Sequence, residues 1–406
     1  MELHFDIEKL VEKHKEILQV ISKNDIKTSK LVGGCVRDFL QFGIFADDID
    51  ISTTFLPDEV IELLKNYKKV NKNNEIVILD KDKKYGTIVV LIDNVRYEIT
   101  TTRADIACFG RDAEVTFCEN FEEDSKRRDF TINALYVGLD GKFCDFHNGI
   151  NDLNNGLIRF IGNADKRIKE DYLRIVRFFR FSAKFNNFNF NKEIIKTLQD
   201  NKQCLHQLSR ERIRSEIWKM LNYKTWFDGL KSIEKCGLID DIFCLTKYNT
   251  TITNDNFFEV FNEKYNTKKY MEVIKLFYFF GYNFDILTEF EEKLKLQNDE
   301  KKFVVFLKKC LFLLKENTLT IELKTIIFHD KMKNNNYILS ILPLLNQEKQ
   351  RSIVDFAEEI KPLPISANEL IKLGYNGAKL GEKLVELTQK WIESDFQASK
   401  TKLLAK

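Results

Sequence analysis

Two aspartates separated by one residue follow closely after a glycine pair in this sequence. Asp48 and Asp50 belong to the stretch DDIDIST, and Gly33-Gly34 follow the apolar pair Leu31-Val32. Residues two apart on a β-strand point to the same face, so the two carboxylates would lie together. Such a pair is costly unless a cation sits between the charges, and hard divalent ions such as Mg²⁺ favour carboxylate oxygens. An exposed acidic turn is the alternative. We predict that Asp48 and Asp50 are catalytic and bind two Mg²⁺ ions for displacement at phosphorus.

The glycine pair supplies the second half of a phosphate site. Without side chains, Gly33 and Gly34 let backbone N–H groups at a helix start approach a phosphate closely. Arg37, one turn into that helix, would add a charged contact. Glycines, arginine and paired aspartates within one strand–turn–helix–strand unit are more specific than any of them alone.

A third candidate lies in the basic segment RIKEDYLRIVRFFRF, which we expect to be helical. Asp171 and Arg174 would share a helix face, with Arg177 one turn further on. The carboxylate can accept from the exocyclic amine of cytosine or adenine, and the guanidinium can donate to ring acceptors. Uracil and guanine would place an oxygen against the carboxylate. The competing interpretation is an ordinary salt bridge within the helix.

The elements that must position these groups divide the chain into an α/β part and a helical part. Strand patterns at about 29–33, 49–53, 74–80, 85–92, 95–102 and 115–117, with a hairpin turn at Asp93-Asn94, predict a head with a mixed sheet over residues 1–155. This head contains the candidate carboxylates. From about residue 165 onwards nearly every segment has helical periodicity. We therefore expect an α+β head followed by an all-α neck (156–225), body (226–360) and tail (361–406).

The composition excludes several classes of protein. Eight cysteines without a CxxC pair and five scattered histidines suggest neither a zinc site nor a disulfide framework. The sequence contains no apolar run of 18 residues, and its first ~25 residues have the pattern of one amphipathic helix. We therefore expect a cytoplasmic protein without a membrane segment. The net charge is only +2, but the basic residues cluster locally, as expected for a phosphate-bearing ligand.

Taken in order, these segments resemble the class II, bacterial-type tRNA nucleotidyltransferase and poly(A) polymerase family over residues 30–221. A further match is RRDFTIN, which in that family recognises the ribose of the incoming nucleotide. The resemblance implies that Asp171 and Arg174 read the base, oriented by Glu170, while the basic residues around them contact the nucleotide. The nucleotide-binding set is then Gly33, Gly34, Arg37, Arg128, Asp129, Asn133, Asp171, Arg174, Arg177 and Arg180.

The resemblance also implies a reaction, the addition of CCA to the 3′ end of tRNA from CTP and ATP with release of pyrophosphate. A loop over 103–114, with Arg103, Asp105 and Arg111, occupies the place of a flexible loop that CC-adding relatives lack. Glu98 is a candidate third carboxylate, although an exposed strand glutamate is an equal alternative. Poly(A) synthesis and CC-only or A-only addition stay open as alternatives within the family.

Two further classes of protein are less well supported. A catalytically silent RNA-binding relative would lack one of the aspartates, and an enzyme that modifies proteins or small molecules would not need the base-reading segment.

In the tail, three glycines would approach the backbone of the tRNA acceptor end and T arm, unless they serve helix packing instead. These are Gly374, Gly377 and Gly381. We infer no protein partner.

Overall fold

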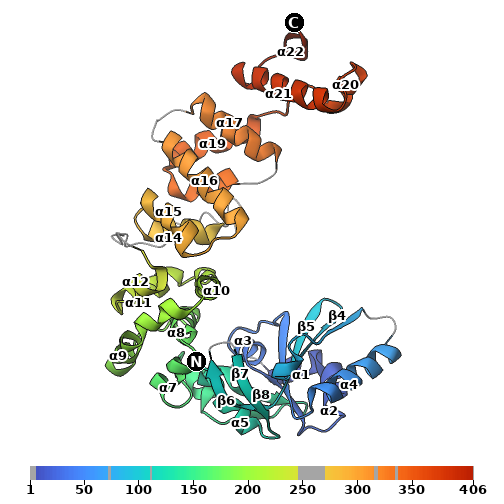
Figure 1. The fold of residues 1–406 in the computed structure, drawn as a ribbon, viewed down its shortest axis with the longest axis vertical. Coiled ribbons are helices and arrows are strands. Elements are labelled where there is room, and N and C mark those ends of the chain that lie inside the picture. Colours follow the sequence, from blue (N-terminus) through green and yellow to red (C-terminus); the bar gives the residue numbers. More distant parts are fainter. Residues whose placement is uncertain are drawn as a thin grey trace. The chain divides into compact units, whose positions relative to one another are not determined.

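The computed structural model describes residues 6–71, 75–109, 112–245, 270–314, 319–333 and 337–405 (Figure 1). Contacts between Cα atoms divide the chain into two compact units, residues 1–244 and 245–406, which are described separately here. This division falls after Cys244, whereas the four-part division into head, neck, body and tail stays a prediction.

Unit 1 begins with the α/β part, built around one sheet of seven strands in the order β3-β4-β5-β2-β1-β8-β9. The neighbouring strands β2 and β5 run parallel, and the other neighbouring pairs in the described sheet run antiparallel. The strands are β1 (Ser29–Val32), β2 (Asp48–Thr53), β3 (Ile76–Leu79), β4 (Thr87–Ile92), β5 (Val95–Thr101), β8 (Leu135–Gly138) and β9 (Phe143–Asp145), and a separate hairpin pairs β6 (Arg103–Phe109) with β7 (Asp112–Phe117).

Helices cover this sheet. Helix α3 packs against β1, β2 and β8, whereas α4 packs against β3, β4 and β5. Along β2 the buried side chains of Ile49 and Ile51 alternate with the aspartates, so burial of the isoleucines fixes the face on which Asp48 and Asp50 lie. The helices are α1 (Ile7–Lys13), α2 (Lys15–Ser22), α3 (Gly34–Phe42), α4 (Pro57–Val70), α5 (Phe121–Lys126) and α6 (Gly149–Asn154), with short 3₁₀ turns η1 (Lys83–Tyr85) and η2 (Thr131–Asn133).

The rest of unit 1 is helical and shares an aromatic core with the sheet domain. Phe130 contacts Phe160 at a centroid distance of 4.8 Å, and Phe160 stacks on Phe178 at 5.9 Å. Because Phe178 belongs to α8, this cluster joins the α/β part to the helices that follow. They are α7 (Ala164–Glu170), α8 (Leu173–Lys184), α9 (Lys192–Asp200), η3 (Lys202–Gln207), α10 (Arg210–Leu221), α11 (Trp226–Lys235) and α12 (Ile239–Phe243).

The described part of unit 2 consists of helices. One of its cores joins Phe328 to Leu370, Leu387 and Trp391, so this core continues across the predicted boundary between body and tail. In the described parts of the chain, no helix is both long enough and apolar enough to span a membrane. The elements are α14 (Met271–Phe279), α15 (Phe284–Lys293), α16 (Asn298–Leu313), α17 (Ile321–Met332), α18 (Tyr337–Ile341), η4 (Leu342–Leu344), α19 (Gln347–Glu359), α20 (Ala367–Lys372), α21 (Ala378–Glu393) and α22 (Lys400–Leu404).

The predicted fold class, an α+β head followed by helices, is confirmed, but three local expectations are wrong. The N-terminal helix is interrupted at His14, and most of the loop predicted at 103–114 lies in the β6–β7 hairpin. The expected continuous helix through Asp171 breaks there, because Asp171 is extended (φ −153°, ψ 104°) and separates α7 from α8.

Candidate active site

The glycine turn lies against both the carboxylate strand and the RRD segment. Gly33 precedes α3 with a φ of +76°, a conformation that glycine adopts without the strain of a side chain. A Cβ at this position would lie 3.3 Å from Asp50 Oδ2 and 3.5 Å from Arg128 Nη1. Gly33 therefore lets three elements converge: the strand β2, the start of α3 and the segment after α5.

Asp48 and Asp50 lie on β2 in different environments. The Asp48 side chain is 72% exposed and lies 3.5 Å from Arg96 Nη1. Burial and the negative charge of Glu98 raise the pKa of Asp50 to about 6, and Asp48 adds to this effect while Arg128 opposes it. Asp50, the more buried of the two, thus carries a negative charge that its surroundings do not fully compensate.

The candidate third carboxylate lies directly beside Asp50. In the parallel pairing of β2 with β5, Glu98 is the register partner of Asp50, and Arg96 is that of Asp48. Glu98 Oε2 accepts a hydrogen bond from Arg96 Nη2 at 2.9 Å. Within the described residues, no three His, Cys, Asp or Glu side chains are grouped so that they could hold a metal ion. The acidic donors nevertheless fit a hard divalent cation, since such ions take further oxygens from water and phosphate.

The RRD segment is connected to α3 and α8 by a buried polar network. Asp129 accepts from Arg177 Nε at 2.7 Å and from Asn133 Nδ2 at 2.9 Å, and Asn133 Oδ1 accepts from Arg37. Burial alone would raise the pKa of Asp129, but the charge of Arg177 and these hydrogen bonds outweigh it and hold the pKa well below the ordinary value. Asp129 is therefore ionised at neutral pH and orients Arg177 and Asn133.

Asp171 and Arg174 lie at the corner between α7 and α8, and each is held by a different partner. Asp171 Oδ2 accepts from Arg212 Nη2 of α10 at 2.8 Å. Arg174 Nη1 donates to Glu170 Oε2 at 2.7 Å and to the carbonyl oxygen of Arg167 at 2.6 Å. Glu170 therefore orients Arg174, whereas Arg212 orients Asp171, a contact that the sequence did not indicate.

A cavity of about 500 Å³ brings these groups together within unit 1. All ten predicted nucleotide-binding residues line it together with Asp50, whereas Asp48 and Glu98 are not among its lining residues. Six arginines and three aspartates surround it, so its charge suits a polyanion that also carries hydrogen-bond donors. The lining residues that sequence reasoning missed are Leu173, Phe181 and Arg212.

Phe181 organises part of the basic wall. The guanidinium groups of Arg180, Arg37 and Arg177 lie 4.1, 4.8 and 5.4 Å from the centroid of its ring. These cation–π contacts limit the directions in which the three side chains can point. The interleaving of arginine and phenylalanine in RFFRF was the available signal for this arrangement.

The predicted flexible-loop residues are described only in part. Arg103 starts β6, and its guanidinium donates to the carbonyl oxygen of Tyr85. Asp105 lies in β6, but its side chain is outside the described residues, as is Arg111 altogether.

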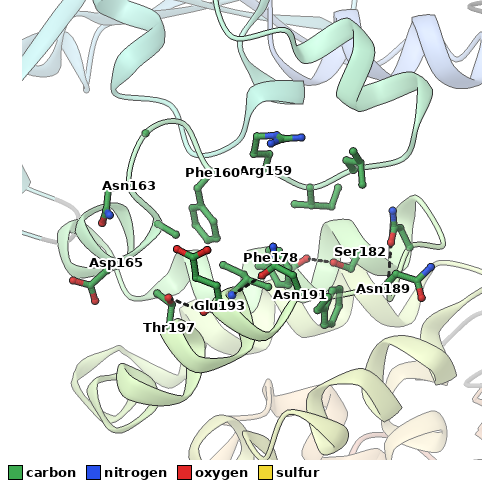
Figure 2. A pocket seen from close by; sticks show the side chains of 17 residues that line it. Arg159, Phe160, Asn163, Asp165, Phe178, Ser182, Asn189, Asn191, Glu193 and Thr197 are labelled. Carbon is green, nitrogen blue, oxygen red and sulfur yellow. Dashed lines mark hydrogen bonds between the residues drawn. The ribbon is translucent and has the colours of Figure 1, made fainter.

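A second cavity of about 470 Å³ lies beside α8, and none of the predicted nucleotide-binding residues lines it (Figure 2). Phe160 and Phe178 face it together with Asn191 and Glu193 of the α9 region. The candidate active site is therefore the cavity at the glycine turn, where carboxylates and arginines converge.

Sequence comparison places this site in a known class of enzymes. Residues 29–159 match the family model described as "Poly A polymerase head domain". Residues 187–247 match a second one, described as "Probable RNA and SrmB- binding site of polymerase A". The resemblance found in the sequence is confirmed: the fold and these matches define a nucleotidyltransferase.

Relatives of similar length identify the family. The chain is 31% identical to the mitochondrial CCA tRNA nucleotidyltransferase 1 of Danio rerio over 96% of this chain and 89% of that protein. It is 40% identical to the CCA-adding enzyme of Lactobacillus helveticus over 47% of this chain and 45% of that protein. The chain belongs to the CCA tRNA nucleotidyltransferase family.

Solved structures show the same fold. The Bacillus stearothermophilus CCA-adding enzyme in complex with CTP matches with a TM-score of 0.71 at 22% identity, over 96% of this chain and 95% of that one. The Thermotoga maritima CCA-adding enzyme complexed with tRNA matches with a TM-score of 0.60 at 22% identity, over 99% and 98% of the two chains.

Proposed function

We propose that this chain adds CCA to the 3′ end of tRNA from CTP and ATP, and that the reaction takes place in the cavity at the glycine turn. The observation that carries the proposal is the convergence in one cavity of Gly33, Asp50 and Arg128 with Asp171 and Arg174. The first three suit a metal-bound triphosphate, and the last two suit the edge of a base.

In the proposed reaction, the 3′-oxygen of the RNA forms a bond to the α-phosphorus of the nucleotide. The bond between that phosphorus and the bridging oxygen breaks, pyrophosphate leaves, and the hydroxyl proton passes to solvent. Asp48 and Asp50 would hold Mg²⁺, which supplies charge stabilisation at the reacting oxygens when bound. Arg128 and Arg37 would bind the phosphates, which keeps the leaving group in line with the attacking oxygen.

Base selection is proposed to depend on Asp171 and Arg174. Asp171 would accept from the amino group that cytosine and adenine share, while Arg174 donates to the ring acceptor. Their contacts to Arg212 and Glu170 fix both side chains before a base arrives. Prior orientation reduces the entropy that binding must overcome.

Complete CCA addition is preferred over partial addition or poly(A) synthesis for two reasons. The β6–β7 hairpin lies in the segment that we infer to correspond to the loop that CC-adding relatives lack. In addition, the relatives with matching length are named CCA tRNA nucleotidyltransferases, including the human mitochondrial protein, 30% identical over 93% of this chain and 85% of that one.

The tail is proposed to bind the tRNA acceptor end and T arm. Gly374 and Gly377 have φ angles of +92° and +57°, and no described atom lies within 4 Å of a Cβ built at either position or at Gly381. Helix packing between described residues therefore does not explain these glycines. The positive φ angles of Gly374 and Gly377 suit the helix ends at which they lie, and the open space around all three leaves their backbone accessible to phosphates. A cytoplasmic location is likewise a proposal, which cell fractionation would test.

Single-nucleotide gel analysis tests the proposed reaction. Purified protein with Mg²⁺ and a tRNA lacking its 3′ end is supplied with CTP, ATP or both. We expect three added nucleotides ending in A, and loss of addition in Asp50→Asn. Asp47→Asn is the matched control because Asp47 is exposed and directly precedes the pair.

The other outcomes separate the alternatives. A stop after two nucleotides would indicate a CC-adding enzyme, and addition of a single A only to a tRNA that already ends in CC would indicate an A-adding enzyme. A long A ladder on unrelated RNA would indicate a poly(A) polymerase. No incorporation would refute the proposed reaction.

A further inference from the structure

The guanidinium of Arg128 is held by a closed ring of hydrogen bonds. Arg128 Nε donates to Tyr136 Oη at 3.0 Å, and this hydroxyl donates to Asp124 Oδ2 at 2.7 Å. Arg128 Nη2 closes the ring by donating to the same oxygen at 3.2 Å. The remaining nitrogen, Nη1, is directed to the glycine turn, 3.5 Å from the position of a Cβ on Gly33. Two of the three guanidinium nitrogens thus serve orientation, and the third faces the candidate phosphate site.

The ring is buried and charged. Asp124 and Tyr136 are both 0% exposed. Burial would raise the pKa of Asp124, but Arg127, Arg128 and the hydroxyl of Tyr136 outweigh it and lower the pKa to about 2. Asp124 is therefore an anion at neutral pH, and Tyr136 supplies it with a hydrogen bond while accepting one from Arg128.

Tyr136 does not itself reach the cavity. It is not among the lining residues, and its ring packs in a core with Val32, Phe121 and Ile161. A second tyrosine provides a comparison: Tyr97 on β5 is also buried, and its hydroxyl is bonded to His14 Nδ1 at 3.1 Å, away from the cavity. The Tyr136 hydroxyl differs from it in having an active-site arginine as its partner.

We propose that Tyr136 is a positioning residue for nucleotidyl transfer, whose hydroxyl directs Arg128 Nη1 at the phosphates of the nucleotide beside Asp50. The inference rests on the proposed function of the cavity. Without the hydroxyl, Arg128 keeps its ion pair with Asp124 but loses the acceptor of Nε, so its guanidinium plane is no longer fixed by two contacts. Small displacements of a phosphate-binding group are costly for transfer chemistry.

The test compares Tyr136→Phe with Tyr97→Phe. Each variant removes one hydrogen-bonded hydroxyl and keeps the aromatic ring, so we expect similar small losses of thermal stability. The dissociation constant of CTP and of ATP is measured with Mg²⁺ but without RNA, followed by KM and kcat for addition. We expect about tenfold weaker nucleotide binding and a similar rise in KM for Tyr136→Phe, and less than twofold changes for Tyr97→Phe. Equal effects of the two variants on binding, or none, would overturn the proposal.

A double-mutant cycle tests whether Tyr136 acts through Arg128. Arg128→Lys keeps the positive charge but removes Nε, so adding Tyr136→Phe in that background should change the dissociation constant by less than twofold. Independent, multiplying effects would show that Tyr136 acts by another route.

The binding measurements also separate this proposal from the proposed function. If the wild type binds CTP with the expected difference between the two tyrosine variants but adds no nucleotide to tRNA, the proposed reaction fails while the role of Tyr136 holds. If the wild type binds neither nucleotide, both fail.

Discussion

Replacing Asp50 with asparagine should stabilise the folded protein while abolishing nucleotide addition. Burial and the charge of Glu98 raise the pKa of this carboxyl from 3.8 to about 6. The folded state therefore holds the proton more tightly than the unfolded chain does. Ionisation of Asp50 then destabilises the folded state as the pH rises from about 4 to above 6. Asparagine has a similar shape but cannot ionise, so the substitution removes this pH-dependent loss of folding stability.

The magnitude follows from the pKa shift. A shift of about two units corresponds to about 3 kcal/mol between the two protonation states. Asp50 is only partly buried, and screening by solvent reduces the expected effect to about 1–2 kcal/mol. About half of this gain should be present at pH 5. All of it should be present at pH 7.5, because Asp50 is then fully ionised in both the folded and the unfolded wild type.

Urea unfolding without divalent ions measures the effect. Tryptophan fluorescence follows unfolding, with Trp218 and Trp226 in unit 1 and Trp391 in unit 2, and Asp48→Asn is the control. Because the Asp48 side chain is 72% exposed, its loss should change stability by less than about 0.5 kcal/mol. Mg²⁺ should then stabilise the wild type and leave Asp50→Asn unchanged. An Asp50→Asn protein that is no more stable than the wild type, or whose gain does not depend on pH, would refute this account of the carboxylate pair.

Three further substitutions test the geometry of the site and its surroundings. Gly33→Ala should lower kcat/KM for nucleotide addition at least tenfold, because its Cβ would face Asp50; Gly162→Ala has a similar φ of +77° but open space around it and should leave kinetics unchanged. Asp129→Asn should lower the free energy of unfolding by about 2–4 kcal/mol at pH 7, since Arg177 would lose its nearer buried carboxylate and keep only Glu216, 3.7 Å from its Nη1, and denaturant titration measures it. Gly149→Ala should lower the melting temperature, because its Cβ would overlap a backbone carbonyl, and an unchanged melting curve would contradict the packing described here.

Local sequence patterns predicted most of the α/β part. Alternating and β-branched residues indicated β1, β2, β4 and β5, and the turn at Asp93-Asn94 was confirmed with φ angles of +48° and +68°. Strand β9 was missed because Phe143–Asp145 is too short for a periodic signal. Residues 103–114, which include β6 and the start of β7, were interpreted as a loop, because the pairing of these strands is not visible in a local pattern.

The site was predicted through motifs, and its missing parts come from tertiary structure. The residues Glu170 to Arg174 all lie in a helical pattern, yet the chain is extended at Asp171, whose side chain accepts from the backbone of Leu173 and from Arg212. These contacts override local propensity. Arg212 is 41 residues away from Asp171 in the sequence, so no spacing rule could have placed it in the cavity. Tyr136 is only 8 residues away from Arg128, but no helix or strand spacing relates the two positions, so their contact was not predicted either.

The parallel pairing of β2 with β5 has one more consequence. It places Arg96 between two acidic side chains, Asp48 and Glu98, with one guanidinium nitrogen near each. The carboxylates therefore already have a cation, one that is attached to the chain and cannot diffuse away. A divalent ion entering from solvent would have to displace this guanidinium from the carboxylates, so metal binding at this site would be an exchange of one cation for another. The metal affinity of such a site would depend on how much more strongly the carboxylates bind the metal ion than the guanidinium, and Arg96 would return to them if the metal ion left.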